Sequence, residues 1–180
     1  MVERQVTRHL VAKIPPPALH AGFSGKPLEE PLQGKALEFR SSFSDAEKAK
    51  ARELIERSFG RPLRAGYLDA PFSMAIVAPG FSGIAIIKSI DNVPYLDKFA
   101  VDPEMQGRGV GRQIWESIKS QHESLVWRAF AENPCKCWYE KNSEGSLAIV
   151  PWIVYWYGLG REKAEALAEK AAALPMTIIR

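Results

Sequence analysis

The stretch YLDKFAVDPEMQGRGVGRQIW, residues 95–115, decides the fold of this chain. It begins as an apolar, β-rich run and turns at Asp102-Pro103. A loop follows in which Gly107, Gly109 and Gly111 alternate with larger residues, and a helical pattern then begins. A glycine-rich loop between a strand and a helix is typical of phosphate sites, because its N–H groups and the helix N-terminus face the anion. The stretch therefore predicts a phosphate-binding loop, and the question is which molecule it holds.

Three phosphate-binding motifs compete for the sequence QGRGVGR. A P-loop requires Gly, four residues and then Gly-Lys-Ser/Thr, and no such sequence stands here. The dinucleotide fingerprint G-x-G-x-x-G/A puts Arg112 where a small residue is needed for close packing of helix on strand. The pattern that fits is Gln106-x-x-Gly109-x-Gly111, which resembles the Q-x-x-G-x-G/A loop of the Gcn5-related N-acetyltransferases. Arg108 and Arg112 add positive charge beside the expected phosphates.

The rest of the chain has the pattern of one mixed α/β domain. Ser44 followed by Glu47 is a capping-box signature, and it predicts a helix that ends near Gly60. Two β-rich runs separated by proline and glycine, residues 73–80 and 83–90, predict a hairpin. We expect further strands at 94–101, 124–131, 152–158 and 176–180, helices at 111–121 and 161–174, and one or two helical turns at 135–142.

Composition narrows the class of protein and its partners. The net charge of the 180 residues is only +3 and the cations are scattered, so we expect no nucleic acid, while an anionic ligand is compatible with this charge. No apolar run approaches the roughly 18 residues of a membrane span, so no membrane partner is expected. Cys135 and Cys137 make neither a disulfide framework nor, with the scattered histidines, a metal site. We therefore expect no metal and a reducing cytoplasm, with the mitochondrial matrix less favoured.

The proline-rich segment 1–36 has no periodic pattern, so we expect it to be an N-terminal arm or linker. We expect the acetyltransferase-like domain to cover residues 37–180, because the regular pattern of apolar positions begins there.

Several motifs, in order, resemble the acetyltransferase domain of vertebrate-type N-acetylglutamate synthase and of bifunctional N-acetylglutamate synthase/kinase. The likeness runs from about Leu37 to Leu174. It is carried by ERSFGRPLRAGYL, PYLDKFAV, GVGRQIWE, VWRAFAENPCKCWYEKNSEGS and WIVYWYGL. The resemblance implies the Gcn5-related fold, a central, mostly antiparallel sheet flanked by helices. It implies transfer of acetyl from acetyl-CoA to the α-amine of L-glutamate, in arginine biosynthesis. In that family the domain follows an amino-acid kinase domain, which is not among these residues, so a homo-oligomer or a separate kinase partner is expected.

Carried over position by position, the resemblance also implies the site residues. Asn133 and Tyr139 match the proposed catalytic pair in N-P-x-x-x-W-Y. The acceptor and its acetyl group are expected at Arg61, Lys98, Phe99 and Arg128. Acetyl-CoA is expected along the strand end and the glycine loop, at Phe99, Ala100, Val101, Gln106, Gly107, Arg108, Gly109, Val110, Gly111 and Arg112.

The chemistry of acyl transfer fits these residue types, although each has a structural alternative. A phenol titrates near pKa 10, above a thiol near 8.5, so Tyr139 stays protonated and can protonate the leaving thiolate. Tyr139 is otherwise a core aromatic, and Asn133 before a proline is otherwise a turn former. Lys98 is otherwise a strand-edge charge with Asp97 on the opposite face. Asp97 and a water relay are alternative proton acceptors.

One position departs from the family pattern. The family reads W-R-S-R, whereas this chain reads Trp127-Arg128-Ala129-Phe130, so an expected second arginine is missing. Because a bidentate arginine contact is the strong way to hold a carboxylate, this change favours a different acceptor as an alternative to glutamate. That acceptor is another amino acid or amine, for example one with a single carboxylate and an apolar group. A non-catalytic acetyl-CoA-binding module is the third hypothesis.

Overall fold

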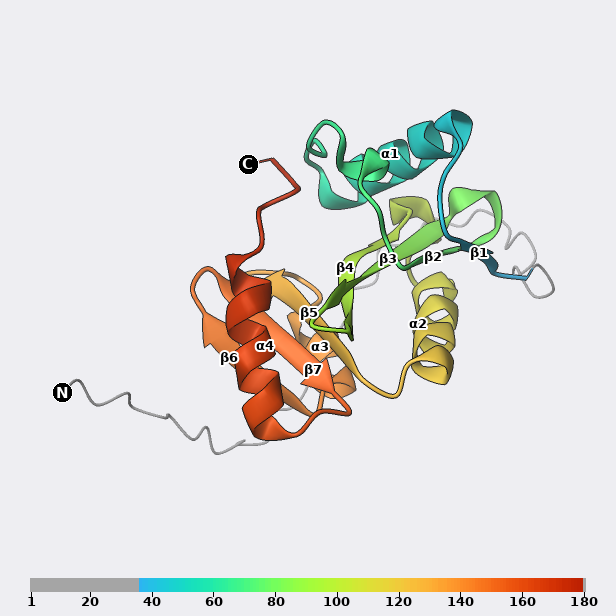
Figure 1. Ribbon diagram of the computed structural model, residues 1–180. Coiled ribbons are helices and arrows are strands. Elements are labelled where there is room, and N and C mark those ends of the chain that lie inside the picture. The colour runs from blue at the N-terminus through green and yellow to red at the C-terminus, as the bar shows by residue number, and fades with distance from the viewer. Residues whose placement is uncertain (1–35, 180) are drawn as a thin grey trace. The chain divides into compact units, whose positions relative to one another are not determined.

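A computed structural model describes residues 36–179, which all belong to one compact unit. The predicted arm at 1–36 lies outside the described residues except for Ala36. Seven strands form one sheet in the order β1-β2-β3-β4-β5-β7-β6 (Figure 1). The strands are β1 Glu38–Arg40, β2 Met74–Val77, β3 Gly83–Ile90, β4 Val93–Val101, β5 Leu125–Phe130, β6 Gly145–Ile149 and β7 Trp152–Tyr157. The helices are α1 Asp45–Phe59, α2 Val110–Gln121, α3 Lys136–Asn142 and α4 Arg161–Ala173.

The sheet is antiparallel except where β4 and β5 meet, so the predicted mostly antiparallel sheet is confirmed. These two parallel strands pair only at Tyr95↔Val126 and Leu96↔Trp127. Both strands continue beyond that point, β4 to Val101 and β5 to Phe130, without further pairing between them. The two strands therefore part in the middle of the sheet, after Leu96 and Trp127, and the glycine loop follows the unpaired end of β4.

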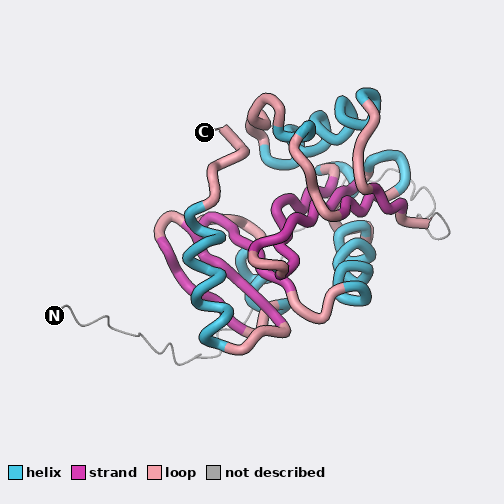
Figure 2. Tube along the Cα trace, viewed as in Figure 1, coloured by secondary structure: helices cyan, strands magenta, loops and turns pink. Residues whose placement is uncertain are grey.

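Helices cover both faces of the sheet, as the amphipathic patterns predict. The buried side of α1, at Leu54 and Ile55, packs on one face, and α4 packs on the same face farther along. The apolar side of α2, at Ile114, Trp115 and Ile118, packs on the opposite face with aromatic residues of β5 and β7. Figure 2 shows the strands as one magenta layer between these cyan helices.

Most elements lie where the sequence pattern puts them. Ser44 and Glu47 form the capping box at the start of α1, and Gly60 ends that helix in the left-handed conformation with φ 62°. The sequence pattern did not predict β1 and β6. Both are edge strands with largely exposed side chains, so apolar and polar residues alternate only weakly along them.

The predicted strand at 176–180 is wrong. In the described residues it makes one isolated bridge, between Leu63 and Ile178, and its remaining backbone hydrogen bonds go to the loop after α1. Between residues 36 and 179, no helix is long and apolar enough to cross a bilayer.

Candidate active site

A cavity of about 960 Å³ opens where β4 and β5 part. Its walls come from β4, the glycine loop, β5, α3, the end of α1 and the residues that follow α4. Of the residues predicted for the site, the cavity brings together Arg61, Lys98, Phe99, Val101, Gln106, Gly107, Gly109, Gly111, Arg112, Arg128, Asn133 and Tyr139. Ala100 and Val110 do not line it, since their side chains are core residues, and Arg108 lies exposed outside it.

The backbone of the glycine loop explains its composition. Gly107 and Gly109 have φ values of 78° and 86°, which L-residues with a side chain adopt at a cost. Gly109 is the N-cap of α2 and no side chain caps that helix, so the first N–H groups of α2 stay open toward a ligand. Gly111 is different, because a Cβ there would lie 3.4 Å from the Val101 side chain, an ordinary contact. This agrees with the G/A choice in the motif.

The two loop arginines differ in their surroundings. The Arg112 Nε donates to Glu116 Oε1 at 2.8 Å, so the guanidinium turns back along α2. No ion pair engages Arg108 among residues 36–179, and its side chain remains available at the surface beside the loop.

A β-bulge places two charged neighbours on the same side of β4. Lys98 pairs with Ile86 and Leu96 with Ile87, which leaves Asp97 as the extra residue. The alternation that would put Asp97 and Lys98 on opposite faces is therefore broken. Lys98 Nζ lies 3.2 Å from Asp97 Oδ1, and Lys88 Nζ lies 2.9 Å from Asp97 Oδ2.

The cluster around Asp97 is buried and tightly bonded. The hydroxyl of Tyr67 donates to Asp97 Oδ2 at 2.7 Å, and Lys98 is 4% exposed. Burial acts to raise the pKa of Asp97, but the ammonium groups of Lys98 and Lys88 outweigh it and hold that pKa below its usual value. Burial lowers the pKa of Lys98 because it disfavours the ammonium form.

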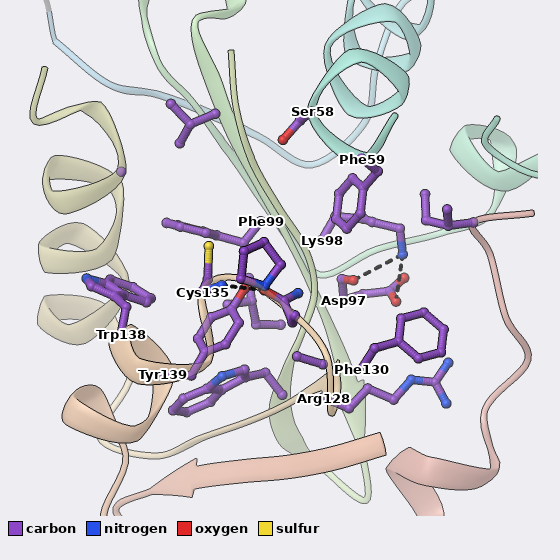
Figure 3. Close-up of a pocket in the computed structure, with 18 of the residues that line it drawn as sticks. Ser58, Phe59, Asp97, Lys98, Phe99, Arg128, Phe130, Cys135, Trp138 and Tyr139 are labelled. Carbon is purple, nitrogen blue, oxygen red and sulfur yellow. Dashed lines mark hydrogen bonds and ion pairs between the residues drawn. The ribbon is translucent and has the colours of Figure 1, made fainter. Parts of the chain in front are cut away.

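Tyr139, on α3, lies on the other side of the cavity from Lys98 (Figure 3), and Asn133, in the turn before α3, lines the same cavity. The ring of Tyr139 packs among aromatic residues, 5.6 Å from that of Tyr155, and burial raises the pKa of Tyr139. The Asn133 Oδ1 accepts the N–H of Cys135 at 2.8 Å, which is the turn that starts α3. Burial also raises the pKa of Cys135, so its thiol stays protonated.

Arg128 occupies the cavity wall but is engaged by backbone. Its Nη1 lies 2.7 Å from the carbonyl oxygens of Ala171 and Leu174 and 3.0 Å from that of Ala172. Its Nη2 donates to the Pro175 carbonyl at 2.8 Å, and the guanidinium lies 4.1 Å over the ring of Trp152. The arginine that the sequence assigns to the acceptor thus holds the C-terminal end of α4.

Sequence reasoning missed part of the cavity wall. The residues after α4 line it with Met176, Thr177 and Ile178, and the end of α1 adds Phe59. Trp152 joins the same wall, where its ring stacks on that of Phe130 with centroids 4.0 Å apart. No periodic pattern marks these positions, because they come from a helix end, a strand start and an irregular segment.

Comparison with known proteins identifies both a family and individual relatives. The family described as "NAT, N-acetyltransferase, of N-acetylglutamate synthase" matches residues 38–173. The mitochondrial N-acetylglutamate synthase of Mus musculus is 38% identical over 130 residues. That alignment covers 68% of this chain and 24% of the relative, so the chain spans about a quarter of the relative's length.

Solved structures match at the level of the fold. A putative acetyltransferase of the GNAT family from Bacteroides thetaiotaomicron has a TM-score of 0.58 at 17% identity, covering 76% of this chain and 97% of that one. The N-acetylglutamate synthase of Neisseria gonorrhoeae, solved with coenzyme A and N-acetyl-glutamate, has a TM-score of 0.52 at 16% identity. That match covers 72% of this chain and 36% of the synthase, and it confirms the predicted fold.

Proposed function

The chain belongs to the N-acetyltransferase family of N-acetylglutamate synthase, and from this premise we propose that it acetylates the α-amine of a free amino acid with acetyl-CoA. One observation carries the proposal. The glycine loop with an open helix N-terminus follows the end of β4 that has parted from β5, and the same cavity reaches Tyr139. A pyrophosphate at the loop therefore lets a thioester lie in the gap between the strands.

The residues present fit acetyl-CoA as co-substrate. Two left-handed glycines allow the backbone to approach a pyrophosphate, and a cavity of about 960 Å³ leaves room for the pantetheine chain and an acceptor. Beyond Leu96, alternate N–H groups of β4 point toward the unpaired side of the strand, where they can donate to the thioester carbonyl oxygen. Acetyl-CoA supplies an activated acyl group.

In the proposed ternary complex, the acceptor amine attacks the thioester carbon, the N–C bond forms and the C–S bond breaks. Tyr139 is the group proposed to give its proton to the departing thiolate; its raised pKa keeps it protonated at neutral pH and also makes it a weaker acid. The amide NH₂ of Asn133 is the group proposed to orient the acceptor or the thioester. The lowered pKa of Asp97 makes it a weak base, so we assign removal of the amine proton to water.

L-Glutamate is the first acceptor to assay, because it is the acceptor that the family resemblance implies. Phe130 favours a second candidate, an amino acid or amine with fewer negative charges, since this residue stacks on Trp152 where the family pattern has an arginine. Both candidates share the donor and the chemistry, and they differ only at the acceptor end of the cavity.

The test is release of free CoA thiol with a panel of amino acids, each run beside a reaction that lacks acceptor. The expected result is acceptor-dependent release, with the N-acetyl product identified by mass spectrometry. Calorimetry of acetyl-CoA binding is the matched control. Binding without acceptor-dependent release across the panel would reject the enzyme and favour the non-catalytic binding module.

A further inference from the structure

We infer that the acceptor end of the cavity takes an amino acid with a single carboxylate and an apolar side chain, and that the segment after α4 sets this preference. The acceptor end is the part of the wall formed by Phe59, Arg61, Lys98, Phe130, Trp152 and Met176. The inference rests on the proposed acetyltransferase function and names its substrate class.

Three cationic side chains line this cavity away from the glycine loop, and two of them are engaged. Lys98 contacts the Asp97 carboxylate and donates to Thr177 Oγ1 at 2.6 Å. Arg128 lies against four backbone carbonyl oxygens at the end of α4. Arg61 is exposed, and no side-chain hydrogen bond or ion pair engages it among residues 36–179. This leaves one uncommitted cation for the acceptor, which suits one carboxylate.

A second carboxylate on the acceptor meets an unfavourable site. It must lose water without gaining a charged donor, and a desolvated charge that lacks a partner is costly. The side chain of Glu132 also lines the cavity and carries the same sign of charge.

The remaining surface of the acceptor end is apolar. Phe59 and Met176 are 37% and 43% exposed, although large apolar side chains are usually buried, and both line the cavity. The stacked pair of Phe130 and Trp152 continues this surface. Figure 3 shows Phe59, Lys98, Phe130 and Arg128 grouped on one side of the labelled residues, away from Tyr139. Exposed apolar groups that converge on one cavity indicate an apolar ligand group.

The segment after α4 is fixed in place at both ends. Arg128 binds the carbonyl oxygens of Leu174 and Pro175. The N–H of Arg64 donates to the Thr177 carbonyl at 2.8 Å, and that of Ile179 donates to the Pro62 carbonyl at 2.9 Å. The family match ends at residue 173, so this part of the wall comes from residues outside that match. Its side chains can therefore set an acceptor preference particular to this chain.

The experiment compares kcat/KM of the wild-type chain for L-leucine, L-methionine and L-phenylalanine with that for L-glutamate. At least one apolar amino acid is expected to exceed glutamate about tenfold or more, within the range by which apolar pockets and unpaired charges discriminate substrates. A higher value for glutamate overturns this inference and leaves the proposed function standing. Absence of acetylation with every amino acid overturns both.

Two matched variants test the wall itself. Met176→Ser is expected to lower kcat/KM for the preferred apolar amino acid about tenfold and to leave the value for glutamate within twofold. Ile179→Ser is the control, because Ile179 has a similar exposure of 49% in the same segment but does not line the cavity. It should change neither value, and thermal unfolding of both variants checks that they fold. Equal losses with both acceptors in Met176→Ser would refute the assignment.

Discussion

Replacing Arg128 by alanine separates two roles for this residue. In the structure, its guanidinium contacts the four carbonyl oxygens of Ala171, Ala172, Leu174 and Pro175 and stacks on Trp152. If this is its function, Arg128→Ala should destabilise the fold and loosen the segment after α4. If Arg128 instead exists to hold an acceptor carboxylate, the variant should fold normally and bind the acceptor poorly.

The magnitude follows from the contacts. A hydrogen bond from a charged donor contributes about 1.5–3 kcal/mol, and a cation over an exposed aromatic ring adds roughly 0.5–1 kcal/mol. The sum of these contributions is an overestimate for two reasons. Three of the carbonyl oxygens share the two protons of Nη1, and in the variant water can donate to the carbonyl groups at the helix end in place of Arg128. We expect a loss of about 3–5 kcal/mol in the free energy of unfolding, or about 10–15 °C in Tm for a domain of this size.

Urea unfolding followed by tryptophan fluorescence gives the free energy of unfolding, and steady-state assays give the KM of the acceptor. Arg161→Ala is the matched control, since Arg161 lies in α4, the helix whose end Arg128 contacts, and its guanidinium pairs with Glu165 at the surface. The control should keep wild-type stability. The reasoning fails if Arg128→Ala unfolds like the wild type while the KM of the acceptor rises tenfold or more.

Three further predictions concern the donor site, the acid and pH. Gly109→Ala should weaken acetyl-CoA binding about tenfold, because the left-handed backbone conformation at this position costs a residue with a side chain about 1–2 kcal/mol. Gly111→Ala should weaken binding much less. Calorimetry measures both affinities. Tyr139→Phe should lower kcat by about 10²-fold or more at unchanged acetyl-CoA affinity, and an unchanged kcat would remove the acid role. Hydrogen bonds from the N–H of Ser44, from Arg40 and from the Ser44 hydroxyl lower the pKa of Glu47 to about 2, below the value in the unfolded chain. Ionised Glu47 therefore stabilises the fold at neutral pH, and this stabilisation is lost as the pH falls from about 5 to 2. Urea midpoints of Glu47→Gln should therefore lie below wild type at pH 7 and converge with it near pH 2.

The geometry of the glycine loop, the proposed donor half of the site, could be predicted from the sequence because its determinants are local. A strand, a turn at Asp102-Pro103, two glycines in a left-handed conformation and a helix start follow one another within the quoted stretch. Each of these features has its own signature of residue types, and chain continuity alone brings them together. The resemblance to the Q-x-x-G-x-G/A loop of Gcn5-related acetyltransferases rests on the same contiguous residues, whereas the likeness to N-acetylglutamate synthase also draws on motifs elsewhere in the chain.

The acceptor half could not be predicted in the same way because its determinants are far apart in the chain. The family resemblance predicts a carboxylate ligand at Arg128, whereas its contacts with the end of α4 can be seen only in the structure. Asp97 and Lys98 look like neighbours on opposite faces until the bulge in β4 is known. The segment at 174–179 has no pattern of its own, and its backbone pairs with the loop after α1 rather than with the sheet.

Because the determinants of the donor end are local and those of the acceptor end are not, the family resemblance supports the two ends to different extents. A change in the glycine loop alters the backbone that has to approach a pyrophosphate, so that loop can vary little while the donor stays the same. A change at Phe130 or Met176 alters only the side-chain surface of the acceptor end, and the strands and the loop keep their geometry. The motif shared with N-acetylglutamate synthases therefore supports acetyl-CoA more strongly than it supports glutamate. We therefore infer the acceptor from the charged groups and the apolar surface that line its end of the cavity.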